Sequence, residues 1–249
     1  MAAAGAAAGF RFGLSRPDFC GKRALAHLAD CLTTLLTERH SCRAFLPQRV
    51  PQETIARVLE MAQRTPSWCN TQPWQAIVTS GAATERFRAG LLQHAAKGAP
   101  SPDIPFPREY RGVYLERRRV CGWQLYESVG IARGDRDASA RQGMENYRLF
   151  GAPHAAIVTT DEAQGTYGAI DCGAYVNNFM LAAWSLGVAS IAQAAIAGQA
   201  KFVREHFGLA PDRQVLCGIA FGFEDANHPA NKYRTSRAAM KEAVDWVEN

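Results

Sequence analysis

The sequence contains no apolar run that approaches the roughly 20 residues of a membrane-spanning helix, so we do not expect a membrane protein. Its seven cysteines are odd in number, and neither a Cys-x-x-Cys motif nor a His/Cys cluster with zinc spacing is present. These absences argue against a disulfide framework and a metal site, and we expect reduced thiols in a cytoplasmic protein. The first nine residues lack a charged start and an apolar signal core, and we interpret residues 1–22 as a flexible tail.

Recognisable catalytic motifs are also missing. No Gly-x-Ser-x-Gly, His-Glu-x-x-His or Gly-x-Gly-x-x-Gly occurs, and the six histidines are scattered singly. The net charge of +5 forms no long basic stripe with interleaved aromatic residues, which argues against nucleic-acid binding. A mildly basic chain of this kind suits small anionic ligands.

The order of apolar patterns predicts an α+β fold. The chain has 249 residues, of which 47% are hydrophobic, and we assign residues 23–249 to one domain. Stretches with helical spacing alternate with short β-prone runs, which predicts about four strands under helices. The predicted helices are 23–38, 51–62, 84–96, 111–147, 167–186 and 201–207, and the predicted strands are 75–79, 155–160, 188–191 and 214–222. Residues 105–150, with a break near 130–135, are interpreted as a helical insert over the active site.

The most distinctive segment is the basic loop 39–45, which reads Arg39-His-Ser41-Cys-Arg43-Ala-Phe. Leu-Pro follows it, so we expect the preceding helix to end here. Two guanidinium groups and a hydroxyl at this spacing suit a phosphate, because each guanidinium donates paired hydrogen bonds to oxygen atoms. A solvated basic loop is the alternative interpretation. Phosphate-binding groups without an acid–base set indicate an enzyme whose bound cofactor performs the reaction.

Three segments together resemble the FMN-dependent nitroreductase family. They are Arg39-His-Ser-x-Arg43-Ala-Phe, Pro66-Ser-x-x-Asn70-Thr-Gln-Pro-Trp and the basic tail Arg234-Thr-Ser-Arg237. The pattern Asp171-x-Gly-x-x-x-x-Asn178 also matches, and the insert resembles the branch that includes nitrobenzoate reductases. The resemblance implies an intertwined homodimer with two FMN molecules in its interface. It also implies a mixed central sheet flanked by helices, in which each C-terminal tail lends a strand to the partner. The nearly all-apolar helix 167–186 would be the dimer core.

The resemblance also assigns cofactor-binding residues. Arg39 and Ser41 would face the FMN phosphate and ribityl chain, and Arg43 the N1/O2 edge of the ring, where positive charge stabilises the reduced flavin. Arg237 would join Arg39 at the phosphate, and the backbone of Ala194 would give an N–H to flavin N5. The full set is Arg39, His40, Ser41, Arg43, Ala192, Gln193, Ala194, Ala195, Arg234 and Arg237, with Pro66, Ser67, Trp68 and Asn70 supplied by the other subunit. No side chain is expected to be catalytic.

Three of these positions depart from the family's usual residues. Trp68 stands where a small residue is common, and it either stacks on a substrate or has a structural role. Ala192 and Ala194 stand in a turn that often contains Pro and Glu. A backbone donor does not depend on the side chain, so the implied contact with the ring survives these departures.

The implied reaction is a ping-pong transfer in which NAD(P)H gives a hydride to flavin N5 and a nitroaromatic compound is then reduced to nitroso and hydroxylamine products. Trp68, Tyr114 and Trp123 are candidate substrate-binding residues, and the arginines 117–119 either attract a carboxylate or form a solvated helix face. The alternatives are the same flavin fold acting as a dehalogenase or enone reductase, and a flavin-binding module without turnover. No dinucleotide motif indicates a preference for NADH or NADPH.

Overall fold

The structure, a computed structural model, describes residues 22–248 and divides into two compact units, one ending at Glu38 and one beginning at Arg39. This boundary lies at the end of the first predicted helix, not at residue 22. The first unit contains α1 (Lys22–Glu38), whose leucines repeat at helical spacing. Leu25, Leu28, Leu32 and Leu36 each keep about half of their surface exposed. The predicted tail 1–22 lies outside the described residues, except for Lys22.

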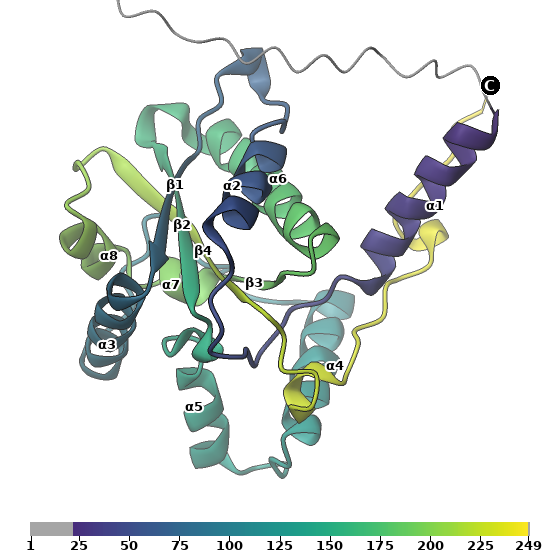
Figure 1. Cartoon of the computed structure of the whole chain (residues 1–249). Coiled ribbons are helices and arrows are strands. Elements are labelled where there is room, and N and C mark those ends of the chain that lie inside the picture. Colours follow the sequence, from purple (N-terminus) through teal and green to yellow (C-terminus); the bar gives the residue numbers. More distant parts are fainter. Residues whose placement is uncertain (1–21, 249) are drawn as a thin grey trace, which may run out of the picture. The chain divides into compact units, whose positions relative to one another are not determined.

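The second unit is built on a four-stranded sheet with the order β1-β2-β4-β3 (Figure 1). The strands are β1 (Gln75–Ser80), β2 (His154–Asp161), β3 (Ala189–Gln193) and β4 (Arg213–Gly222), close to their predicted positions. All three pairings are antiparallel, and the one parallel pairing among the described residues is an isolated bridge between Ser41 and Ser190. Within the described residues the parallel component of the predicted mixed sheet is that bridge, and the strand that a partner would lend lies outside a single chain.

Helices cover both faces of the sheet (Figure 1). One face packs against α2 (Gln52–Ala62) and α6 (Gly165–Ser185), and the other against α3 (Ala82–Lys97), α7 (Ala194–Ala197) and α8 (Ala200–Phe207). Strand β2 is buried on both sides because its alternate residues enter the two cores: Ala155 and Ile157 face one, and Ala156 and Val158 the other. This arrangement confirms the α+β prediction.

The turn after β3 is held close to the sheet by a glycine. Gly218 in β4 is paired with Gln193, and a Cβ atom on Gly218 would lie 2.4 Å from Cδ1 of Ile196 in α7. A side chain there would push α7 away from β4, because Ile196 is fully buried. The glycine therefore fixes the position of the β3–α7 turn, which the sequence singled out as a cofactor contact.

Helix α6 is buried on one side only. Cys172, Tyr175, Phe179 and Ala183 face the sheet and α2, as the apolar pattern predicts. Tyr167 and Ile170, by contrast, are each 58% exposed near the start of the helix. The predicted all-round burial of this helix is therefore not reached within one chain, since Tyr167 contacts the exposed Trp68 ring and still keeps most of its surface.

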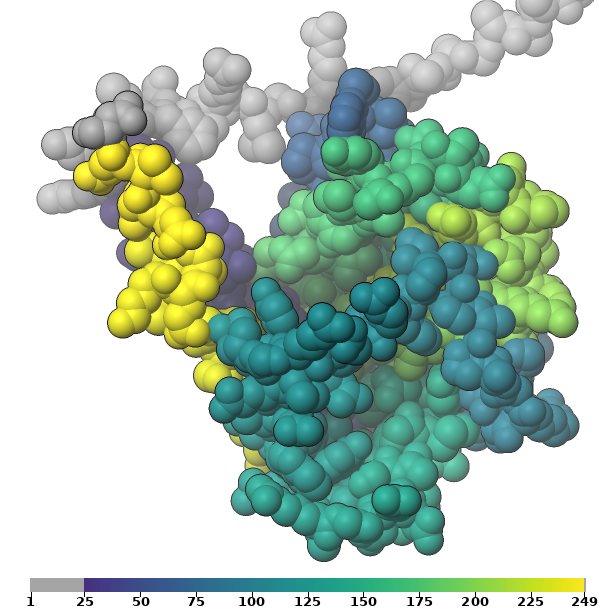
Figure 2. All heavy atoms as spheres, turned by 180° about the vertical axis from the view of Figure 1, so that it is seen from behind, coloured from purple at the N-terminus to yellow at the C-terminus, as the bar shows by residue number. Residues whose placement is uncertain are grey.

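The predicted helical insert is present as α4 (Gly112–Ser128) and α5 (Arg136–Met144), separated by the break expected near residues 130–135. Asp135 ends the break by capping α5, since its Oδ1 accepts a hydrogen bond from the Ala138 N–H at 2.8 Å. Neither helix has a buried residue, so the insert is a surface layer (Figure 2, teal).

Residues 232–248 contain no strand and only one short 3-10 turn, Met240–Glu242. This segment touches the insert through an ion pair between Arg117 and Glu242, whose N–O distance is 3.2 Å. Trp246 is 74% exposed. The lent strand implied by the family is thus not formed within this chain and stays a prediction. No helix in residues 22–248 is long and apolar enough to cross a bilayer.

Candidate cofactor site

The basic loop runs beside edge strand β3. Ser41 forms a parallel bridge with Ser190, and the Cys42 N–H donates to the Ser190 carbonyl at 3.1 Å. In this extended stretch Cys42 and Ala44 point into the core, and burial raises the pKa of the Cys42 thiol to about 12. Arg39, Ser41 and Arg43 alternate with the buried residues and stay partly exposed. The Arg-x-Ser-x-Arg spacing therefore presents three polar side chains on one side of an extended strand.

His40 anchors this loop through its ring. The ring nitrogen Nε2 lies 2.9 Å from Oε1 of Glu224, just after β4, and the ring packs edge-on against Trp184 of α6 at 5.3 Å between centroids. The His40 side chain is only 9% exposed. These contacts of the ring hold the loop in place. The predicted contact of His40 with a cofactor would therefore be made by its backbone.

A buried asparagine ties the basic loop to the start of the C-terminal tail. Asn231 is 3% exposed, and its Oδ1 accepts from the Arg43 N–H at 2.6 Å. Its Nδ2 donates to the Ala44 carbonyl at 2.9 Å and to the Asp225 carbonyl at 3.0 Å. The Arg43 guanidinium donates to the Ser41 carbonyl at 3.2 Å and lies 5.6 Å from the centre of the Tyr233 ring. Sequence reasoning missed Asn231, because no local pattern marks a contact across 188 residues.

The charge of Arg237 acts on Arg39 although the two residues lie at opposite ends of the second unit's sequence. Burial first, and then the positive charge of Arg237, lowers the pKa of the Arg39 guanidinium. Neither has an acidic partner in residues 22–248: Arg237 donates only to Thr235 and the Ser236 carbonyl, within its own tail. Two like charges without a carboxylate between them form a site that an anion would stabilise.

Arg234 has a local role in the same tail. Its guanidinium donates to the Asn231 carbonyl at 2.6 Å and to the Tyr233 carbonyl at 2.9 Å. These bonds shape the turn that carries the chain toward Arg237. Its predicted contact with a cofactor is neither supported nor contradicted by this geometry.

The turn after β3 forms one wall of a cavity of about 240 Å³. Ala192, Gln193 and Ala194 line it together with Arg43, while Leu125, Tyr126, Gln142 and Asn146 of the insert close the other side. Gln193 clamps the insert, since its Nε2 donates to the Asn146 carbonyl at 2.8 Å. The predicted Ala195 is not among the lining residues. We name this the ring cavity: small side chains, an edge strand and one guanidinium suit a flat, electron-accepting heterocycle.

The loop with Pro66, Ser67, Trp68 and Asn70 lies at the other end of α6. The Trp68 N–H donates to Oδ2 of Asp171 at 3.0 Å, and its ring packs edge-on against Tyr167. The Thr65 hydroxyl accepts from Nδ2 of Asn178 at 2.8 Å. Asp171 and Asn178, which the sequence offered only as a matching pattern, therefore hold this loop on α6.

Tight turns shape the loop further. Cys69, Asn70 and Gln72 have φ angles of 49°, 57° and 49°, in the left-handed region that residues other than glycine rarely adopt. Ser67 supports the turn by accepting from the Gln72 N–H at 2.9 Å. Such local strain is commonly kept where a loop must present a group to a ligand, here the exposed amide of Asn70.

One chain does not bring the two predicted groups of cofactor residues together. The basic loop contacts α6 at Trp184, and the Asn70 loop contacts it at Asp171. These positions are thirteen residues apart, or about 20 Å at the rise of an α-helix. Within one chain the two loops therefore contact opposite ends of α6.

The predicted substrate residues are not gathered in the ring cavity. Tyr114 is 67% exposed, and Trp123 lies under the guanidinium of Arg133 at 4.9 Å. Trp68 is on the distant loop. Arg117 pairs with Glu242, and Arg118 stacks on Tyr110 at 5.1 Å, as expected for the solvated helix face that was the alternative interpretation. The insert lines the cavity instead with Leu125 and Tyr126, which carry no sequence signal because α4 has no buried stripe.

Comparisons with known proteins agree with this geometry. A model of the nitroreductase family matches residues 36–223. The chain is 38% identical over 219 residues to nitroreductase NfnB of Mycolicibacterium smegmatis, covering 87% of this chain and 93% of that protein. It is 32% identical over 223 residues to 4-nitrobenzoate reductase of a Nocardioides species, covering 88% and 90%.

Solved structures give the same result. The FMN-dependent nitroreductase NfnB of Mycobacterium smegmatis in complex with NADPH superposes with a TM-score of 0.85 at 36% identity, covering 89% of this chain and all of that one. The FMN- and NADPH-dependent NfnB of a Sphigopyxis strain superposes with a TM-score of 0.84 at 32% identity, covering 87% and 99%.

Proposed function

The chain belongs to the nitroreductase family, and from this membership we propose that it is an FMN-dependent oxidoreductase that oxidises NAD(P)H and reduces nitroaromatic compounds. The relatives named above include a 4-nitrobenzoate reductase and proteins crystallised as FMN- and NADPH-dependent nitroreductases. Bound FMN supplies reversible two-electron chemistry, so the residues of this chain need only bind, orient and shield it.

The observation that carries the proposal is the charge interaction between Arg39 and Arg237. Their guanidinium groups lack acidic partners among residues 22–248, and the charge of one lowers the pKa of the other. A phosphate with up to two negative charges would satisfy both through charge-assisted hydrogen bonds, each contributing roughly 1.5–3 kcal/mol. The partly exposed hydroxyl of Ser41 would form hydrogen bonds with the same phosphate and the ribityl chain of FMN.

Arg43 and the β3 turn would serve the ring end of the cofactor. Arg43 lines the ring cavity, where its positive charge favours negative charge on a reduced heterocycle. The edge of β3 offers backbone groups, and Ala194 follows the strand at the point where the prediction expects an N–H donor. Leu125 and Tyr126 of the insert would cover the cavity and exclude water, so that the insert acts as a lid over the site.

We further propose that the active form is a homodimer in which the Asn70 loop of one chain completes the ring cavity of the other. The separation of the two loops along α6 supports it, and Tyr167, Ile170 and the α1 leucines are exposed apolar side chains that such an association would bury. The tail beyond residue 237, with its exposed Trp246, would lend its strand to the partner. A cytoplasmic location fits the free cysteines of the described chain.

A mixed-dimer experiment tests this shared site. One chain would carry Arg39→Gln and the other Asn70→Ala, so each parent homodimer carries its change in both sites, and activity is measured at an FMN concentration too low to fill the Arg39→Gln site. A mixed dimer keeps one site with native Arg39 and Asn70, and we expect about half of the wild-type activity. A mixed dimer as inactive as its parents would contradict a site built from two chains.

The reaction itself is tested with purified protein. It should bind FMN and oxidise NAD(P)H only when an electron acceptor such as a nitroarene is added. A panel with a halogenated phenol and an enone beside the nitroarene separates nitro reduction from the alternative reactions of the same fold. A protein that takes up no FMN would end the proposal, and tight FMN without oxidation of NAD(P)H would indicate a binding module.

A further inference from the structure

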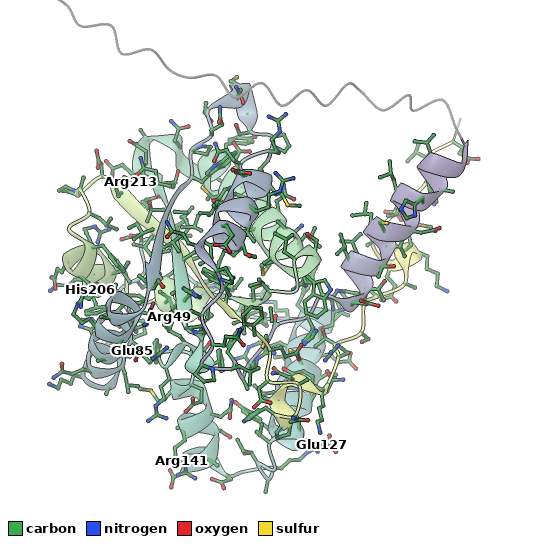
Figure 3. The ribbon with its side chains drawn as sticks, viewed as in Figure 1. Arg49, Glu85, Glu127, Arg141, His206 and Arg213 are labelled. Carbon is green, nitrogen blue, oxygen red and sulfur yellow. The ribbon has the colours of Figure 1, made fainter. Side chains whose placement is uncertain are left out.

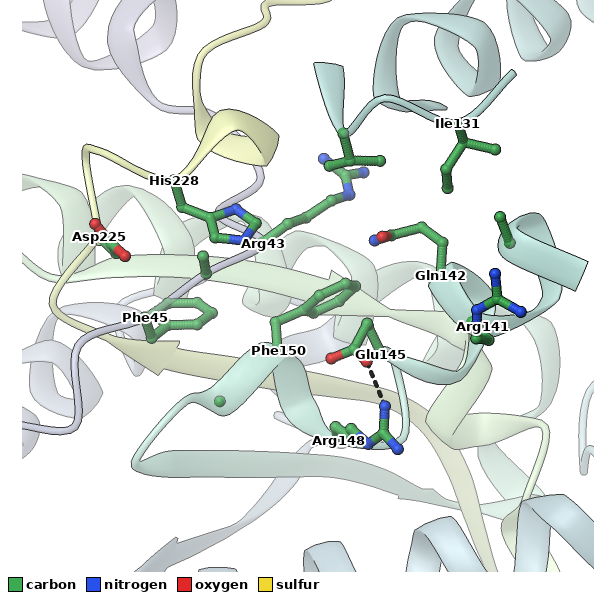
Figure 4. A pocket seen from close by; sticks show the side chains of 14 residues that line it. Arg43, Phe45, Ile131, Arg141, Gln142, Glu145, Arg148, Phe150, Asp225 and His228 are labelled. Carbon is green, nitrogen blue, oxygen red and sulfur yellow. Dashed lines mark hydrogen bonds and ion pairs between the residues drawn. The ribbon is translucent and has the colours of Figure 1, made fainter. Parts of the chain in front are cut away.

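A second and larger cavity, of about 590 Å³, adjoins the ring cavity. The two share Arg43, Gln142 and Phe150 as a common wall. Its size is within the range of small-molecule sites. In Figure 4 the rings of Phe45 and Phe150 lie below Arg43 and Gln142, with Arg141 at one end and His228 and Asp225 at the other. A flat apolar floor with polar groups around it suits an aromatic or heteroaromatic ligand that also carries charge.

The two acidic groups of this cavity are already occupied. Glu145 pairs with Arg148, with an N–O distance of 2.6 Å. Oδ1 of Asp225 accepts from the Asn227 N–H at 3.0 Å. Glu145 is therefore paired with a cation, whereas Asp225 has only a backbone donor. The three arginines Arg43, Arg141 and Arg148 outnumber the two carboxylates of the lining, so the cavity as a whole favours an anion.

The donors, by contrast, remain available. Nδ1 of His228 accepts from the Ala230 N–H at 3.2 Å, so the neutral ring carries its proton on Nε2 as a donor. Arg141 is exposed on α5 and has no hydrogen bond or ion pair with the residues that the structure describes (Figure 3). With Arg43 and Gln142 on the shared wall, the free groups of this cavity are hydrogen-bond donors, two of them positively charged. They select an anion.

We infer that this second cavity binds the phosphate-bearing adenosine end of NADPH, with Arg141 as a phosphate-binding residue. The inference rests on the proposed function. A nicotinamide that reacts in the ring cavity must leave the rest of the dinucleotide outside it, and the second cavity is adjacent because both are lined by Arg43 and Gln142. The floor of Phe45 and Phe150 suits the adenine ring, and the donors suit phosphate.

The sequence contains no dinucleotide-binding motif, so phosphate recognition must come from side chains such as these. We place Arg141 at the 2′-phosphate of NADPH, which NADH lacks, and we therefore expect NADPH to be preferred to NADH. The same chemistry, an aromatic group with an anion, is also found in a nitrobenzoate. The experiment therefore carries one arm for each ligand.

The test uses FMN-loaded protein and two matched variants of α5. Arg141→Gln removes the charge in the cavity, and Arg136→Gln removes an equally exposed charge from the same helix but outside the cavity. Calorimetric titration with adenosine 2′,5′-bisphosphate should give a Kd about 5-fold higher for Arg141→Gln, which corresponds to about 1 kcal/mol for an exposed charge pair. Arg136→Gln should match the wild type. The KM for NADPH should rise with the Kd, and the KM for NADH should rise less.

Two outcomes would overturn the inference. One is the same bisphosphate Kd for both variants. The other is an Arg141→Gln protein in which only the KM for 4-nitrobenzoate rises, with nitrobenzene unaffected, because the cavity would then bind the substrate carboxylate. FMN content and the thermal midpoint, measured in both variants, show whether they are folded. Failure of the wild type to bind FMN would instead end the proposed function, so the two failures are distinguishable.

Discussion

Replacing Asn231 with alanine should destabilise the protein more than any single change on its surface. The side chain is buried, and its amide serves the Arg43 N–H and the carbonyls of Ala44 and Asp225. Truncation leaves the Arg43 N–H and the Asp225 carbonyl without their side-chain partner, whereas the Ala44 carbonyl keeps the Asp225 N–H and the Cys42 thiol as donors. A backbone group left unpaired costs roughly 1–3 kcal/mol where water cannot reach it. With water reaching some of these groups, we expect a loss of about 2–4 kcal/mol, or a thermal midpoint about 5–15 °C lower.

The assay is urea unfolding at a fixed protein concentration, followed by tryptophan fluorescence, with FMN content measured on the same samples. Asn227→Ala is the control, because Asn227 is exposed and contributes only its backbone N–H to the same turn. Asn231→Ala should also lose FMN, since the basic loop is no longer tied to the tail. A variant within 0.5 kcal/mol of the control, with full FMN content, would refute the role assigned to Asn231.

Two further predictions concern the insert and the pH dependence of stability. Gln193→Leu removes the hydrogen bonds to the Asn146 carbonyl and to its Oδ1, so trypsin should cleave the insert about 10-fold faster. Asn146→Ala keeps the carbonyl and loses only the longer bond to Oδ1, at 3.3 Å, and the bond from Nδ2 to the Gly143 carbonyl, so it should have a smaller effect. Equal cleavage of both variants would contradict the clamp. Burial lowers the pKa of His154, whose Nε2 accepts from the Val50 N–H and whose Nδ1 donates to the Thr79 carbonyl. Below the ordinary pKa of 6.5 the unfolded chain therefore binds a proton that the folded chain does not, so stability is full above pH 6.5 and falls below it by up to about 1.4 kcal/mol per pH unit. Urea unfolding at pH 5.5 and 7.5 measures the difference, and a protein more stable at pH 5.5 would contradict it.

Local sequence patterns predicted the secondary structure well, because each signal lies within one element. The apolar positions Ile55, Val58 and Ala62 of α2 are buried as their spacing indicates, and the break between α4 and α5 falls where glycine and aspartate accumulate. The sequence did not reveal that the basic loop is extended rather than the end of a helix. That conformation depends on pairing with β3, about 150 residues away, which no local pattern encodes.

The candidate site was predictable only where a motif marks it. The resemblance led to Arg39, Ser41, Arg43 and Arg237, and the structure brings Arg39 and Arg237 close enough for their charges to interact. It did not lead to Tyr126, Gln142 or Asn146, because the insert has no buried stripe from which an inward face could be identified. Which side chains line a cavity depends on how surface helices dock, and this is decided by tertiary contacts.

The most direct test of the account compares FMN with riboflavin, which lacks the phosphate. Arg39→Gln and Arg237→Gln should each weaken FMN by about 10- to 100-fold, from the loss of one charge-assisted bond, and leave the affinity for riboflavin unchanged. The measurement is the Kd of each flavin by fluorescence quenching of the apoprotein. If both variants bind FMN as tightly as the wild type, or lose riboflavin to the same extent, the two arginines do not hold a phosphate and the central claim is wrong.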